Sequence, residues 1–192
     1  MKKDAIIFDL YGVLGLNGWQ AFKARHFSNR PEAWERLRRL GQRADAGLAA
    51  QHEFVQALVR ETGETAASVR REFEQTRANE PLLQFIAEEL KPLYKIGLLS
   101  NTSHDVFQTI FSPGQLALFD AMIGSFSVGI TKPDPRMFTT MCEQLGTAPE
   151  QCVMVDDMPH HLAAAAALGM STVQYTSVDQ TIRDIREVLA CD

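Results

Sequence analysis

The chain has 192 residues, of which 45% are hydrophobic and 22% are charged, and its formal net charge is −5 at pH 7. This length and apolar content suffice for one well-packed domain with a smaller insertion, whereas the net negative charge argues against a nucleic-acid-binding surface. No stretch approaches the roughly 20 apolar residues that span a bilayer, so we expect no membrane segment.

The three cysteines, Cys142, Cys152 and Cys191, are an odd number without the spacing of a metal site. Two lysines precede the first apolar run, but Asp9 interrupts this run too early for the core of a signal peptide. Unpaired thiols are typical of a reducing compartment. We therefore predict a cytoplasmic protein, and the sequence indicates no particular oligomeric state.

Five short segments are almost continuously apolar, as expected for β-strands that are covered on both faces. They are, in chain order, 5–10, 95–100, 121–126, 152–157 and 171–175. Helical patterns lie between the later segments, at 135–146 and at 161–170, where Gly169 is a candidate C-cap. Strands that alternate with helices predict an α/β fold with a doubly wound, Rossmann-like parallel sheet.

Residues 15–83 interrupt this alternation. No strand is evident there, and the segments 54–61 and 69–77 combine helical spacing with many charged residues. We therefore predict that a helical insertion, the cap, occupies residues 15–83, and that residues 1–14 and 84–192 form the α/β core.

Polar side chains end three of the predicted strands. Asp9 ends the first strand, Ser100 the second, and Asp156 and Asp157 a later one. Ligands of open α/β sheets bind outside the carboxyl ends of the strands, so these side chains should converge on one crevice. Lys132, in the segment GITKPDPRMF, precedes the next helix and can reach the same place. Each residue alone is better explained as a turn former or a helix cap, but the ordered set predicts a functional site.

This ordered set resembles the motifs of the haloacid dehalogenase-like hydrolase superfamily, and the resemblance covers nearly the whole chain. FDLYGVL is similar to the family's first motif, LLSNTS to its second, ITKPDP to its third and VMVDDMPHHLAAAAALGM to its fourth. The helical insertion after the first motif matches the family's type-1 cap. The span from VGITKPDP to DDM resembles the phosphatase branch that includes the N-terminal domain of soluble epoxide hydrolases.

The resemblance implies catalytic roles for three of the matching residues. Asp9 would be a nucleophile that forms a covalent intermediate with the substrate. Ser100 would donate a hydrogen bond to the transferring group, and Lys132 would offset negative charge on that group and on Asp9. The expected substrate is a small molecule, most simply a phosphate ester.

The resemblance also implies a Mg²⁺ site. Asp157 aligns with the direct metal ligand and Asp156 lies beside it, while Asp9 and the backbone carbonyl of Tyr11 would supply further oxygen ligands. The charge balance supports a metal independently, because three carboxylates face one lysine, Lys132. Carboxylates that lie so close cannot all stay ionised without a counter-charge, and Mg²⁺ is a hard cation that takes oxygen ligands.

Tyr11 departs from the phosphatase pattern. Phosphatases of the superfamily usually have a second Asp here, which acts as a general acid and then as a general base, whereas a tyrosine with a reference pKa of about 10 is a poor base. The family's 2-haloacid dehalogenases have a Tyr at this position, but they work without a metal and lack the acidic pair in the fourth motif. A Mg²⁺-dependent phosphatase is the favoured interpretation, and a 2-haloacid dehalogenase or a slow or inactive binding scaffold stays open.

Five residues have weaker signals. Tyr11 and Asn101 are candidates for proton donation or substrate contact. His160 and His161 could bind a metal or the substrate, but polar residues at a helix start are the better explanation. Gly12 is expected to meet a backbone requirement, because the loop must turn sharply beside the ligand.

Overall fold

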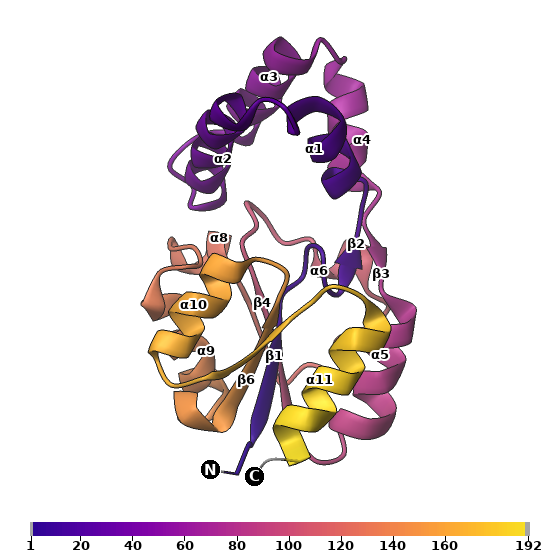
Figure 1. The fold of residues 1–192 in the computed structure, drawn as a ribbon, viewed down its shortest axis with the longest axis vertical. Coiled ribbons are helices and arrows are strands. Elements are labelled where there is room, and N and C mark those ends of the chain that lie inside the picture. The colour runs from indigo at the N-terminus through magenta and orange to yellow at the C-terminus, as the bar shows by residue number, and fades with distance from the viewer. Residues whose placement is uncertain (1, 191–192) are drawn as a thin grey trace.

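A computed structural model describes residues 2–190 of the chain. It has two parts, an α/β core that contains both ends of the described chain and a group of four helices that lies above one edge of the core sheet (Figure 1). Within the described residues, no helix is both long enough and apolar enough to cross a membrane.

The core is built on a five-stranded parallel sheet with the strand order β5-β4-β1-β6-β7. Its strands are β1 (Ala5–Phe8), β4 (Lys95–Ser100), β5 (Ala121–Gly124), β6 (Cys152–Asp156) and β7 (Ser171–Gln174). Each lies within a segment that the sequence predicted as a strand. The predicted Rossmann-like α/β fold is confirmed.

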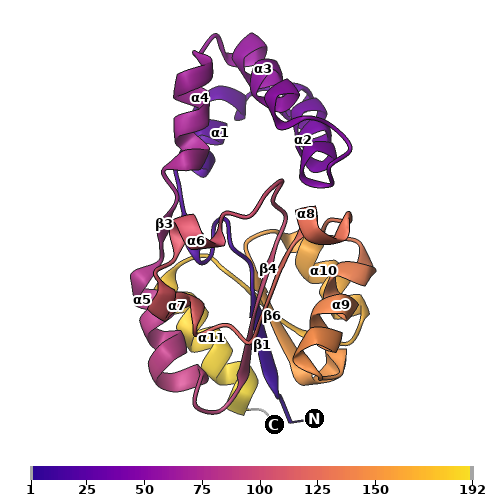
Figure 2. The same cartoon turned by 180° about the vertical axis from the view of Figure 1, so that it is seen from behind.

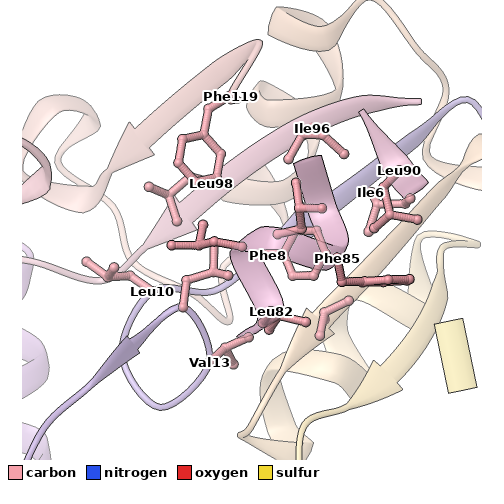
Figure 3. Close-up of a cluster of buried hydrophobic side chains, with 14 of the residues drawn as sticks. Ile6, Phe8, Leu10, Val13, Leu82, Phe85, Leu90, Ile96, Leu98 and Phe119 are labelled. Atoms are coloured by element: carbon pink, nitrogen blue, oxygen red, sulfur yellow. The ribbon is translucent and has the colours of Figure 1, made fainter. Parts of the chain in front are cut away.

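The side chains of β1 alternate between two apolar layers, because successive residues of a strand point to opposite faces of the sheet. Ile6 and Phe8 pack on one face, where Figure 3 shows Phe8 beside Leu82 and Phe85. Ala5 and Ile7 pack on the other face. The first face is covered by α5 (Glu80–Phe85), the π-helical turn η1 (Ile86–Leu90) and α11 (Val178–Ala190), and the second by α9 (Pro135–Leu145) and α10 (Pro159–Ala167).

The two helices predicted between the later strands are both present. Met137, Met141 and Leu145, which recur every four residues in α9, are all buried against the sheet. Helix α10 begins earlier than predicted, at Pro159, and Gly169 follows its end with a φ of +89°, the left-handed conformation that favours glycine after a helix. The other short helical turns of the core are α6 (Phe107–Ile110), α7 (Pro113–Leu116), α8 (Ser125–Val128) and η2 (Pro149–Gln151).

The cap consists of four helices with a hydrophobic cluster of their own. They are α1 (Trp19–Phe27), α2 (Pro31–Asp45), α3 (Gln51–Thr62) and α4 (Ala66–Glu74). Buried residues from all four, among them Phe22, Leu37, Leu58 and Val69, meet in that cluster. Figure 2 shows the cap helices as a separate layer above the sheet.

The expectation that residues 15–83 contain no strand is wrong. β2 (Gly15–Leu16) pairs antiparallel with β3 (Arg77–Ala78), and this ribbon is where the chain leaves the core and returns to it. Two-residue strands are too short to show an alternating pattern, so periodicity does not detect them. Because Leu82 and Leu83 pack with β1, we propose that the cap ends at this ribbon, a few residues before the expected boundary.

Asn79 fixes the returning strand to the first loop of the core. The side chain is buried, and its Nδ2 donates to the carbonyl of Val13 at 2.8 Å and to the hydroxyl of Tyr175 at 3.1 Å. We expect Asn79→Ala to lower the free energy of unfolding by about 1–3 kcal/mol, because it leaves the Val13 carbonyl without its partner. Urea unfolding measures the loss. Tyr175→Phe is the matched control, which keeps the Val13 bond and should cost less, and an Asn79→Ala protein as stable as wild type would contradict the prediction.

Candidate active site

The carboxyl ends of β1, β4 and β6 meet below the cap. Strand β1 lies between β4 and β6, so the chain leaves β1 toward one side of the sheet and later returns to its other side. Such a switch point is where open α/β sheets bind ligands. A cavity of about 670 Å³ lies between this edge and the cap, and the predicted site residues that line it are Asp9, Tyr11, Asn101, Lys132 and Asp157.

Lys132 joins two of the predicted carboxylates. Its side chain is fully buried, and its Nζ lies 2.8 Å from Asp9 Oδ1 and 2.6 Å from Asp156 Oδ2. Burial disfavours the ammonium form, but the two carboxylates outweigh this effect and raise the pKa of Lys132. The lysine is therefore charged at neutral pH.

Asn101 holds the main chain of Lys132 in place. Its Nδ2 donates to the Lys132 carbonyl at 2.9 Å, and its Oδ1 accepts from the Lys132 N–H at 2.8 Å. The amide of Asn101 is thus engaged by the protein, although the residue also lines the cavity. Its expected contact with the substrate stays a prediction.

Asp9 is nearly buried, at 6% exposure, and has two donors on one oxygen. Asp9 Oδ1 accepts from the N–H of Leu10 at 2.7 Å and lies beside the Lys132 ammonium. Burial and the neighbouring carboxylate of Asp156 raise the pKa of Asp9 to about 8, although Lys132 opposes the shift. Additional positive charge is therefore needed to keep Asp9 ionised at neutral pH.

Asp156 is surrounded by donors. Its oxygens accept from Lys132 Nζ and from the N–H of Met158 at 2.9 Å, and His161 Nδ1 lies 3.0 and 3.1 Å from the two oxygens. Burial raises the pKa of Asp156, but Lys132 and His161 outweigh it, and the pKa lies well below its usual range. Asp156 is therefore ionised and fully engaged in holding its neighbours.

The sequence analysis explained His161 as a polar residue at a helix start, but in the structure its side chain also contacts Asp156. It is the third residue of α10 and is buried, and burial lowers the pKa of its imidazole. A neutral ring at neutral pH then donates its Nδ1–H to Asp156, a tautomer that we assign from the hydrogen-bond network. The sequence signal was its position five residues after Asp156, on the inner side of the first helical turn.

Asp157 faces the cavity. Its Oδ2 accepts from Gln20 Nε2 of the cap at 3.0 Å, and burial together with Asp156 raises its pKa to about 6. Gly12 allows this position, because its φ is +87° and a Cβ there would lie only 2.8 Å from Asp157 Oδ2. The backbone requirement predicted for Gly12 is confirmed.

The acidic groups of the site fit a hard cation by charge. Three carboxylates lie near one lysine, and in two of them, Asp9 and Asp157, burial first and the charge of Asp156 second raise the pKa, which a bound cation would offset. Among the described residues, Asp9, Asp156 and His161 bring potential ligand atoms within 4.8 Å of one another. This cluster includes His161, which the predicted ligand set of Asp9, the Tyr11 carbonyl, Asp156 and Asp157 did not, and it does not include Asp157.

Ser100 and Tyr11 complete the predicted set. The hydroxyl of Ser100 is fully buried and has no hydrogen-bond partner among the described residues, and a buried polar group of this kind is rare unless a ligand or water satisfies it. Tyr11 lines the cavity, close to the side chain of Thr102. Burial raises the pKa of Tyr11 above its ordinary value of 10, so the phenol stays protonated at neutral pH.

The sequence did not specify which residues of the cap face the cavity. Gln20 reaches Asp157, and Trp19 and Trp34 contribute an aromatic wall on which Lys23 lies with its Nζ 5.4 Å from the centre of the Trp34 ring. Which face of a helix meets the core depends on how the cap is oriented, and a single sequence does not specify that orientation.

A buried Asp–Lys–Asp network at the switch point of a parallel sheet, covered by a helical cap, is the arrangement of a capped hydrolase with a Rossmann-like core. The family model of the haloacid dehalogenase-like hydrolases matches residues 3–169 of the chain. The chain belongs to this family, as its motifs predicted.

Two curated relatives illustrate the range of the family. The chain is 31% identical over 117 residues to bifunctional epoxide hydrolase 2 from Sus scrofa, a match that covers 58% of this chain and 21% of that protein. It is 29% identical over 89 residues to (S)-2-haloacid dehalogenase 4A from Burkholderia cepacia, which covers 45% of this chain and 38% of that protein. The matches therefore span less than half the length of either relative.

Two solved structures share the whole architecture. A HAD-like family hydrolase from Porphyromonas gingivalis has a TM-score of 0.70 at 26% identity, with 98% of each chain covered. A HAD family enzyme from Bacteroides thetaiotaomicron, in complex with magnesium and inorganic phosphate, has a TM-score of 0.65 at 22% identity, with 91% of this chain and 94% of that chain covered. These similarities agree with the fold described above.

Proposed function

We propose that the chain is a Mg²⁺-dependent phosphohydrolase that acts on a small phosphate monoester through an aspartyl-phosphate intermediate on Asp9. The observation that carries the proposal is the excess of negative charge at Asp9 and Asp157, which Lys132 alone does not balance. A structural relative that binds magnesium and inorganic phosphate supports the same chemistry.

Each core residue has a role in this proposal. An oxygen of Asp9 attacks phosphorus, Lys132 holds Asp9 in position and offsets charge on the phosphoryl oxygens, and the free hydroxyl of Ser100 donates a hydrogen bond to one of them. Asp156, bound to Lys132 and His161, keeps the lysine in place.

The cation would be held by Asp9, Asp157 and the backbone carbonyl of Tyr11, with Asp156 beside them. When bound, Mg²⁺ supplies positive charge that stabilises the phosphoryl oxygens and the ionised form of Asp9. Replacement of the usual Asp by Tyr11 leaves the backbone ligand in place, because every residue has a carbonyl.

A 2-haloacid dehalogenase is the second candidate. Tyr11 favours it, since the family's dehalogenases have a tyrosine here and a halide needs no proton to leave, and the similarity to a Burkholderia dehalogenase agrees. Asp157 disfavours it. A metal-free enzyme would leave this partly buried carboxylate next to Asp156 without compensation, which is costly.

A substrate screen with the purified protein separates the candidates. Phosphate esters and short 2-haloacids are each supplied with Mg²⁺ and, separately, with EDTA. We expect phosphate release that requires Mg²⁺. Halide release that persists in EDTA would establish the dehalogenase, and release of neither product would indicate a binding scaffold.

We expect Asp157→Asn to abolish or strongly weaken Mg²⁺ binding, because the amide lacks the charge that the cation compensates. Isothermal titration calorimetry measures the affinity, and Mg²⁺ should raise the melting temperature of wild type but not of the variant. Asp179→Asn, an exposed position on α11, is the matched control and should bind as wild type does. Equal affinity in Asp157→Asn and wild type would contradict the proposed metal site.

A further inference from the structure

Asp45, the last residue of α2, presents an unpaired carboxylate to the active-site cavity. Within the described residues, three carboxylates line this cavity, and Asp9 and Asp157 are the other two. No hydrogen bond or ion pair joins the Asp45 carboxylate to another described residue, and burial is what acts on its pKa. The residue is partly buried, and a partly buried carboxylate without a partner is costly, so its position in an active-site cavity indicates a function.

The main chain of Asp45 is tied to the loop that carries the second motif. The buried hydroxyl of Ser125, at the start of α8, donates to the Asp45 carbonyl at 2.7 Å and accepts from the N–H of Thr102 at 2.9 Å. Figure 1 shows the core-facing end of α2 above α8. The end of α2 that carries Asp45 is therefore held against the loop that contains Thr102.

The loop that contains Thr102 lies near Tyr11. Tyr11, Asp45 and Thr102 line the same cavity, and Thr102 and the charge of Asp45 both act on the pKa of the Tyr11 phenol. Tyr11 occupies the position two residues after Asp9, where the phosphatases of the family have their second Asp. Asp45 therefore reaches, from the cap, the region in which an acid is missing from the core.

The protonation of Asp45 suits such a role. Burial raises the pKa of its carboxyl group to about 7. Asp45 also lies at the C-terminal end of α2, where the helix dipole disfavours an anion. A group whose pKa is near the working pH can donate a proton in one step and accept one in the next. Tyr11, with a pKa above 10, does not serve as the base.

We propose that Asp45 is the general acid and base of the reaction, supplied by the cap in place of the residue that Tyr11 replaces. The inference rests on the proposed phosphohydrolase function. As Asp9 attacks phosphorus and the ester P–O bond breaks, protonated Asp45 gives its proton to the leaving oxygen. The Asp45 carboxylate then takes a proton from water as the water oxygen attacks the aspartyl phosphate, which releases inorganic phosphate and restores Asp9 and protonated Asp45.

Two substrates of similar size test the acid role. The leaving group of 4-nitrophenyl phosphate departs without a proton, whereas the alkoxide of benzyl phosphate requires one. We expect Asp45→Asn to lower kcat/KM for benzyl phosphate by about 10²- to 10⁴-fold. The value for 4-nitrophenyl phosphate should change by less than about tenfold, because kcat/KM reports only the steps up to departure of the leaving group and this leaving group needs no proton. A purely structural role would lower both equally.

The base role has a separate readout. With 4-nitrophenyl phosphate, Asp45→Asn should release a stoichiometric burst of 4-nitrophenolate and accumulate phosphorylated Asp9, which intact-protein mass spectrometry detects after acid quenching. Asp179→Asn is the matched surface control and should behave as wild type.

Three results would overturn the inference. The first is an equal loss of kcat/KM on both esters in Asp45→Asn, and the second is no loss on either ester. The third is a selective loss of kcat/KM on benzyl phosphate in His160→Gln instead, since His160 also lines the cavity. If wild type hydrolyses neither ester with Mg²⁺, the proposed function itself fails and the inference fails with it.

Discussion

Asp9→Asn should lower the rate of phosphate release by at least about 10⁴-fold for any ester that the enzyme hydrolyses. Removal of a catalytic nucleophile typically has an effect of this size. An amide does not attack phosphorus to form the acyl-phosphate bond, and the change also removes one of the two carboxylates that hold Lys132. The measurement is steady-state phosphate release with saturating Mg²⁺, together with a search for phosphorylated protein in quenched reactions. Wild type should yield the phosphorylated form and the variant should not.

The interpretation of this result depends on an intact fold. The contact between Lys132 and Asp156, at 2.6 Å, does not involve Asp9, so we expect the variant to unfold at a temperature close to that of wild type. A folded Asp9→Asn protein with near-normal turnover would show that water attacks the substrate directly, and the nucleophilic role of Asp9 would be wrong. The dehalogenase alternative also needs Asp9, so loss of activity alone does not choose between the two reactions.

The sequence predicted the core well because its signals are local and strong. A strand such as β6 is buried on both faces and therefore reads as a continuous apolar run, CVMVD. Polar residues at the ends of such strands converge by the geometry of a parallel sheet, which is why Asp9, Lys132 and Asp156 could be expected in one place before they were seen in contact.

What the sequence missed depends on long-range orientation. The two-residue strands β2 and β3 are defined by their pairing with each other and have no pattern of their own. His161 contacts Asp156 because the fold brings the start of α10 beside the end of β6, and the sequence does not show this proximity. Gln20 and Asp45 enter the cavity because of how the cap sits on the core, and Asp45 in the sequence is simply one more acid in a highly charged segment.

Under the proposed phosphohydrolase function, Asp45 would explain why Tyr11 can occupy the position where phosphatases of the family have a second Asp. If Asp45 supplies the acid, the tyrosine is tolerated, because the proton reaches the leaving oxygen from the cap. The two positions should then be partly redundant. Effects of residues that serve the same step are not additive, and a double-mutant cycle detects this.

Tyr11→Asp should therefore act differently in two backgrounds. In wild type it should raise kcat/KM for benzyl phosphate by less than about tenfold, since an acid is already present. In the Asp45→Asn background it should recover much of the lost rate, within the range of about 10²- to 10⁴-fold that general acid–base help contributes. The measurement is phosphate release for wild type, both single variants and the double variant, each first shown to fold and to bind Mg²⁺.

The alternatives predict other patterns for the same four proteins. An equal gain from Tyr11→Asp in both backgrounds would mean that Asp45 takes no part in proton transfer and that the wild-type enzyme works without an acid. No gain on any phosphate ester in either background would remove the phosphatase interpretation of this site. For a dehalogenase, Tyr11→Asp would instead lower halide release from 2-haloacids, because it places a new negative charge beside Asp9, where burial and Asp156 already disfavour the ionised carboxylate.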